Sequence, residues 1–133
     1  MRARLVAVVL GLFLVLGAGP AHASDAEDRI TRYDMWIDVA ADGVAQVVLD
    51  LDVDFGHQAN HGPYLTWQIR QYWDETYDVV SPIRDVRASS PTADATVVTE
   101  TSGDDLAIRI GSEDRTYTGV HSYRVSFQVE GWV

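Results

Sequence analysis

Apolar and polar residues alternate along most of the chain after residue 30. The pattern is clearest in 44–55, where every second residue from Ala45 to Phe55 is apolar. A period of two is typical of a strand with one buried face. The same period predicts strands at 30–40, 78–88 with an interruption at Pro82, 95–100, 106–110 and 120–130. Short strands separated by turn sequences predict an all-β fold, an antiparallel β-sandwich, rather than a parallel α/β sheet.

The first two predicted strands form a hairpin, because Asp42-Gly43 between them is a strong turn signal. A two-residue loop would pair position 39 with position 46 and would place apolar side chains opposite polar ones. A three-residue loop pairs position 39 with position 45, so that the two apolar faces coincide. We therefore predict the three-residue loop, with Gly43 in a left-handed conformation.

This register, with 41–43 as the loop, also fixes the polar face of the hairpin. It places Arg32 opposite Asp52, and Trp36 opposite Val48. Both pairs are then expected on the face that points away from the apolar residues of the two strands.

The segment 64–78 fits two patterns. Leu65, Trp67 and Ile69 alternate as in a strand, whereas Leu65, Ile69 and Tyr72 have the spacing of one helical face. We interpret the segment as extended.

The N-terminus has the three parts of an export signal. Arg2 and Arg4 form the positive region, 5–16 is an uncharged apolar core, and 21–23 is a small-x-small cleavage site. An uncleaved signal anchor is the alternative, although the Gly and Pro residues after the core disfavour a continuous helix. We expect cleavage after position 23 and an extracytoplasmic protein, either secreted or membrane-associated.

The chain then divides into a signal peptide, 1–23, an acidic leader, 24–29, and a β-sandwich domain, 30–133. Loss of the signal leaves eight basic against 20 acidic residues, so the formal charge changes from −10 to −12. A charge of this sign repels phosphate backbones, which argues against a nucleic-acid partner. The chain has no Cys and no Lys, which excludes disulfides, thiol nucleophiles and Schiff-base chemistry.

Two groups of residues could be taken for metal ligands. His57 and His61 have a spacing that lets two imidazoles share zinc on a helix, but in an extended chain they are about 13 Å apart. Asp50, Asp52 and Asp54 suggest calcium, yet the outer two are also about 13 Å apart on a strand. We interpret both groups as solvated polar side chains and expect neither a metal nor a cofactor.

An aromatic run is the strongest candidate for a ligand surface. Its five members are Tyr64, Trp67, Tyr72, Trp73 and Tyr77, and the first four form the candidate surface. Exposed Tyr and Trp side chains bind sugars and peptides by stacking. Packing in the core of a domain without disulfides is the competing interpretation.

No motif of a known reaction is present: the chain lacks G-x-S-x-G, H-E-x-x-H and a phosphate-binding glycine loop. We therefore expect a protein that is not an enzyme and that has a binding or structural role. The alternative is an exported carbohydrate-active hydrolase, or a carbohydrate-binding module, that uses the acids and aromatics of 64–77.

Three stretches carry a resemblance to a known family. They are the hairpin 33–55, the element His61-Gly62-Pro63-Tyr64, and the run 108–123 with its Thr-Gly-x-His-x-Tyr sequence. In these the chain resembles bacterial predicted membrane proteins that carry the domain of unknown function 2207, over 30 to 130. The resemblance implies an extracytoplasmic β domain in front of transmembrane helices, and it carries no ligand. It implies no reaction. A cell-envelope protein or glycan is the partner that we expect for an exported module of this kind.

The chain departs from this family in two places. Pro63-Tyr64-Leu65 lacks the arginine that the family usually has after its tyrosine, and the chain stops at Val133, where the family continues. We therefore expect a domain that is incomplete at its C-terminus, with 120–130 as a strand that leaves one edge unpaired. The alternative is a central strand. We also expect His121 to point inward, with a hydrogen-bond partner on its ring.

Overall fold

The computed structural model describes residues 28–131, and this part of the chain consists of strands, turns and loops without a helix. The expected signal peptide, 1–23, and most of the expected leader, 24–29, lie outside the described residues. The strands are β1 (Arg29–Val39), β2 (Ala45–Asp54), β3 (Tyr64–Gln68), β4 (Arg70–Tyr72), β5 (Asp78–Val80), β6 (Ile83–Ser89), β7 (Val97–Ser102), β8 (Asp105–Ile110) and β9 (Val120–Val129).

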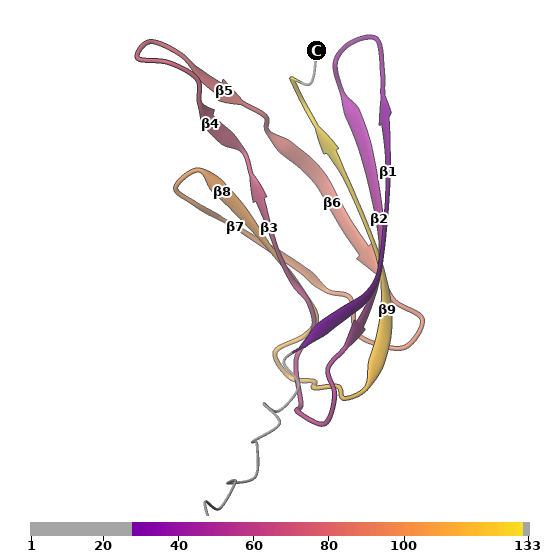
Figure 1. Ribbon diagram of the computed structural model, residues 1–133. Coiled ribbons are helices and arrows are strands. Elements are labelled where there is room, and N and C mark those ends of the chain that lie inside the picture. The colour runs from indigo at the N-terminus through magenta and orange to yellow at the C-terminus, as the bar shows by residue number, and fades with distance from the viewer. Residues whose placement is uncertain (1–27, 132–133) are drawn as a thin grey trace, which may run out of the picture.

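All strand pairs are antiparallel, and they form three sheets. A four-stranded sheet has the order β1-β2-β9-β6, a three-stranded sheet has the order β3-β8-β7, and β4 and β5 form a two-stranded hairpin. Figure 1 shows the two larger sheets as separate layers, with the β4–β5 hairpin projecting beyond the three-stranded one. The predicted all-β antiparallel class is confirmed.

One hydrophobic core lies between the two larger sheets. Alternate residues of β2, β8 and β9 are buried in it, as the two-residue period requires. Trp67 on β3 packs its ring edge-on against Phe127 on β9, with 4.9 Å between ring centroids. The core therefore depends on contacts between strands that are far apart in the sequence.

The first hairpin has the predicted register. Val39 pairs with Ala45, Arg32 with Asp52, and Trp36 with Val48. Gly43 has a φ of 83°, a conformation that costs glycine little because it has no Cβ. The three-residue loop is therefore confirmed, as is the extended interpretation of 64–78, which contains β3, β4 and the start of β5.

The expectation about the sheet edge at 120–130 is wrong. β9 is a central strand that pairs with β2 on one side and β6 on the other, so 120–130 does not leave an unpaired edge. β1 is an edge strand instead, and its expected apolar face is half-exposed. Tyr33, Ile37 and Val39 are exposed, and only Met35 packs against the core. Alternation along a strand shows that one face is apolar, but it does not show which sheet covers that face.

Two glycines allow the β2–β3 loop to cross the turn after β8 at close range. A Cβ on Gly62 would lie 1.9 Å from the carbonyl oxygen of Ile110, and a Cβ on Gly111 would lie 1.9 Å from that of His61. Both glycines also have positive φ values, of 142° and 122°. The crossing brings together two of the three stretches that carry the family resemblance.

Candidate functional site

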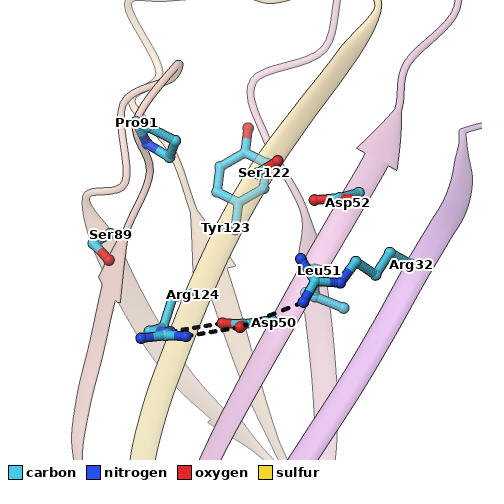
Figure 2. A pocket seen from close by; sticks show the side chains of 9 residues that line it. All are labelled: Arg32, Asp50, Leu51, Asp52, Ser89, Pro91, Ser122, Tyr123 and Arg124. Atoms are coloured by element: carbon cyan, nitrogen blue, oxygen red, sulfur yellow. Dashed lines mark hydrogen bonds and ion pairs between the residues drawn. The ribbon is translucent and has the colours of Figure 1, made fainter.

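The outer face of the four-stranded sheet carries rows of polar side chains, one from each strand. In one row Asp34, Asp50, Arg124 and Ser89 are consecutive cross-strand neighbours. Figure 2 shows Arg32 and Arg124 approaching Asp50 from the two neighbouring strands. Arg124 donates two hydrogen bonds to the Asp50 carboxylate, at 2.7 and 2.8 Å, and Arg32 lies 3.9 Å from it.

The electrostatics of this row favour the charged forms of its members. The hydrogen bond from Arg124 lowers the pKa of Asp50, despite the opposing effect of desolvation, and the same bond raises the pKa of Arg124. Asp34 likewise raises the pKa of Arg32, chiefly because it accepts a 2.7 Å hydrogen bond from Arg32 Nε. Asp50 therefore stays ionised near neutral pH and does not serve as a proton donor there.

Two hollows lie on this face, one around the row that contains Asp50 and one at the β6 end of the cross-strand row that runs from Trp36 to Arg87. The first, of about 180 Å³, lies around Asp50, Asp52 and Ser122 (Figure 2). The second, also about 180 Å³, is lined by Gln46, Asp85, Arg87, Ser126 and Gln128. The second hollow is lined by polar and charged side chains, whereas Leu51, Pro91 and Tyr123 also line the first. The second hollow therefore suits a ligand that exchanges hydrogen bonds rather than an apolar one.

The expected acidic ladder, Asp50, Asp52 and Asp54, lies on this outer face but does not act as one unit. Asp54 accepts a 2.9 Å hydrogen bond from the backbone N–H of Gly56 and lies 3.4 Å from Arg29. Its two outer members are therefore held by different groups. Within residues 28–131 no cluster of three or more His, Asp or Glu side chains is arranged to hold a metal ion.

The histidines have local partners. His61 places Nδ1 3.1 Å from the carbonyl oxygen of Ser112 and 2.9 Å from that of Arg115, while His57 is exposed. His121 is partly buried, with ring nitrogens 3.0 Å from Thr92 Oγ1 and 3.0 Å from the Thr118 carbonyl oxygen. The expected hydrogen bond to the ring of His121 is therefore confirmed.

The aromatic run divides between two environments. Trp67 faces the core, as described above, and so does not belong to an exposed ligand surface with the other three candidates. Tyr64 is exposed on β3, whereas Tyr72, Trp73 and Tyr77 gather at the end of the β4–β5 hairpin and are 68%, 71% and 67% exposed. Three aromatic side chains at one hairpin end form what we call the aromatic tip.

The turn that carries the aromatic tip is held by one carboxylate. Asp74 Oδ1 accepts hydrogen bonds from the backbone N–H groups of Thr76, at 2.8 Å, and Tyr77, at 2.9 Å. The N–H of Trp73 donates to the carbonyl oxygen of Tyr77 at 3.1 Å. These bonds fix the turn, so the exposed rings stand on an ordered backbone.

An apolar cleft of about 310 Å³ lies between the two sheets, on the side where β1 and β3 are the edge strands. Ile30, Leu51, Phe55 and Leu65 line it, and Tyr64 stands at its rim. Asn60 donates a hydrogen bond to Asp28 at its polar end. The sequence did not single out this cleft, because its walls come from strands that are distant in the chain.

Trp36 lies opposite Val48 on the outer face, as the hairpin register predicts, but neither it nor the second hollow was a candidate binding site in the sequence. On the outer face of β1, Trp36 is the one aromatic residue, and its neighbours on that face are Arg32, Asp34 and Asp38. A large aromatic side chain on an otherwise polar strand face was the signal that could have indicated an exposed binding platform.

Comparison with known proteins gives a family and no closer relative. Residues 29–133 match the sequence model of a family described as the N-terminal domain of predicted membrane proteins, DUF2207. No curated protein and no solved structure matches the chain. Between residues 28 and 131 there is no helix long and apolar enough to cross a membrane.

Proposed function

Because the chain belongs to the DUF2207 family of predicted membrane proteins and matches its N-terminal domain, we propose that it is an exported, extracytoplasmic β-sandwich module with a non-catalytic binding role. The export-signal pattern of the sequence at 1–23 supports export, and the core shared by two antiparallel sheets supports the sandwich. The partner is a protein of the cell envelope, which the module meets through the aromatic tip.

The observation that carries this proposal is the exposure of the aromatic tip. Tyr72, Trp73 and Tyr77 are each about two-thirds exposed, although Trp and Tyr gain most from leaving water. Clustered exposed aromatics mark recognition surfaces, where such side chains contribute a large share of the binding energy. The hydrogen bonds of Asp74 reduce the ordering that binding would otherwise require.

A glycoside hydrolase is the second candidate, and the geometry supports it less well. The cavity beside Trp67, about 170 Å³ in volume, has no carboxylate among its lining residues. Asp50 and Asp52 do lie together in the first hollow. However, a hydrolase needs one carboxylic acid with a raised pKa, whereas Arg124 lowers the pKa of Asp50.

The absence of cysteine allows a direct test of the tip in its natural setting. Thr76→Cys introduces a single thiol in the tip, and Ser102→Cys introduces a matched exposed thiol at the end of β7. Each variant is labelled with a membrane-impermeant maleimide, both in the cell envelope and after purification. If a partner covers the tip, position 76 reacts more slowly in the envelope than in the purified protein, whereas position 102 reacts at similar rates in both.

Trp73→Ala, added to the Thr76→Cys variant, should restore fast labelling in the envelope because it removes the most exposed ring. Equal rates at position 76 in the envelope and in the purified protein would show that nothing covers the tip. That result would overturn the proposed binding role.

A further inference from the structure

Trp36 is an exposed aromatic side chain on the edge strand β1, among the polar side chains of the outer sheet face. Its cross-strand row continues through Val48 and Ser126 to Arg87, on the outer face of the four-stranded sheet. Trp36 is 52% exposed, so a large part of its ring area is open to a ligand. Since neighbouring strands are about 4.8 Å apart, the row from Trp36 to Arg87 extends about 14 Å across the sheet.

The second hollow, of about 180 Å³, lies at the far end of this row. Its lining includes two amides, Gln46 and Gln128, one carboxylate, Asp85, one guanidinium, Arg87, and the Ser126 hydroxyl. The amide nitrogen of Gln46 donates to the carbonyl oxygen of Phe127 at 3.2 Å, and that of Gln128 donates to Gln46 Oε1 at 3.4 Å. The amide oxygen of Gln128 and the charged groups of Asp85 and Arg87 thus offer both acceptors and donors.

A bulge in β6 presents the carboxylate of this hollow. The register of β6 against β9 shifts between Arg84 and Arg87, and Asp85 within the shift has a φ of 53°. A non-glycine residue in this region is strained, and bulges of this kind redirect side chains at binding sites. The strain at Asp85 is therefore a second indication that the side chains of this hollow have a role beyond packing.

The charges of the face show what kind of ligand it suits. Arg124 pairs with Asp50 and Arg84 pairs with Glu130. Within the described residues neither Arg87 nor Asp85 makes an ion pair with another side chain, so the hollow offers one cation and one anion together. This balance favours an uncharged ligand rich in hydroxyl groups, while the formal charge of −10 disfavours a polyanion.

We propose that this face, from Trp36 to the second hollow, binds an uncharged glycan chain. A sugar ring stacks on the indole of Trp36, and the hydroxyl groups of a neighbouring sugar exchange hydrogen bonds with Asp85, Arg87 and Gln128. The chain of sugars crosses the strands along the row through Val48 and Ser126. This site is separate from the aromatic tip and goes beyond the proposed partner protein.

The test is calorimetric titration of the exported chain with two uncharged hexasaccharides, cellohexaose and the N-acetylglucosamine hexamer, with hexagalacturonate as a charged comparison. We expect saturable binding of at least one uncharged sugar, and weaker or no binding of hexagalacturonate. Trp36→Ala should weaken binding roughly tenfold, because aromatic stacking contributes on this scale. Arg87→Gln, which keeps a hydrogen-bond donor but removes the charge, should weaken it less than Arg87→Ala.

Tyr33→Ala is the matched control, since Tyr33 is also 52% exposed on β1 but lies on the opposite face. It should leave glycan binding unchanged, and thermal unfolding of each variant shows that the domain is still folded. The proposal is overturned if neither uncharged sugar binds at millimolar concentration, if hexagalacturonate binds more tightly, or if Tyr33→Ala and Trp36→Ala have equal effects. Trp73→Ala at the aromatic tip should not change this binding, so failure here leaves the proposed partner site to be judged separately.

Discussion

Substitution of Gly62 by alanine should destabilise the domain far more than alanine at a glycine in an open turn. The added Cβ would lie 1.9 Å from the carbonyl oxygen of Ile110, whereas an ordinary contact begins at 3.4 Å. The β2–β3 loop and the end of β8 would therefore have to move apart by about 1.5 Å. This movement strains the 3.0 Å hydrogen bond from Ile110 N–H to the Pro63 carbonyl oxygen.

The magnitude follows from two costs. A non-glycine residue at positive φ loses about 1–2 kcal/mol, and forced overpacking typically loses about 1–3 kcal/mol. The sum, about 2–5 kcal/mol, is a large part of the total stability of a small domain, which is about 5–15 kcal/mol. It corresponds to a fall in Tm of more than about 10 °C.

Gly103→Ala is the control, because Gly103 also has a positive φ, of 60°, but no atom lies within 4 Å of its added Cβ. It should lose only about 1 kcal/mol. Urea unfolding monitored by tryptophan fluorescence gives the free energy of unfolding of both variants. Equal losses in the two variants would refute the close crossing, and Gly111→Ala should behave like Gly62→Ala.

Three further predictions concern single side chains. Trp67→Ala should lower the free energy of unfolding by about 3 kcal/mol or more, because it removes the contact with Phe127. Trp73→Ala should change the free energy of unfolding by less than about 0.5 kcal/mol. Similar losses in the two variants would place Trp67 outside the core. Tyr123→Phe should leave stability unchanged or raise it, because the buried hydroxyl has no hydrogen-bond partner. Burial raises the pKa of Tyr123 to about 12, so the wild type should lose stability relative to Tyr123→Phe as the pH rises from about 10 to 12. If Tyr123→Phe were less stable than the wild type at neutral pH, the hydroxyl would have a hydrogen-bond partner. Because the pKa of Asp50 is lowered from 3.8, its ion pair with Arg124 stabilises the fold above that pH, and this stabilisation is lost as the pH falls below it. Urea unfolding between pH 2 and 7 should therefore show a smaller loss of stability at acid pH in Asp50→Asn than in the wild type. Identical pH profiles for the two proteins would contradict this.

Local pattern in the sequence was sufficient for the strands and for the first hairpin. The alternation in 44–55 defined the buried face of β2, and the face-matching argument gave the correct pairing of Val39 with Ala45. These features depend on side-chain period and turn geometry, both of which act over a few residues. The same local reasoning resolved 64–78 as extended.

The arrangement of strands within each sheet could not be predicted in this way. β9 lies between β2 and β6, and β1 lies at an edge, because β9 pairs with strands that are far from it in the chain. Ala45 pairs with Val129, and Ser89 pairs with Arg124. The environment of Trp67 depends on the same long-range pairing, since it faces the core only because β3 pairs with β8 across from β9. The two hollows on the outer face likewise combine side chains from separate strands.

The central claim is that the module lies outside the cytoplasm, and the Ser102→Cys variant tests it most directly. Ser102 is exposed at the end of β7, away from the aromatic tip, and its replacement would be the one thiol in the chain. Intact cells and lysed cells are treated with a membrane-impermeant maleimide, and the labelled fraction of the protein is measured by mass. We predict the same complete labelling in intact and lysed cells, whereas labelling that appears only after lysis would contradict the extracytoplasmic location and the function proposed for this domain.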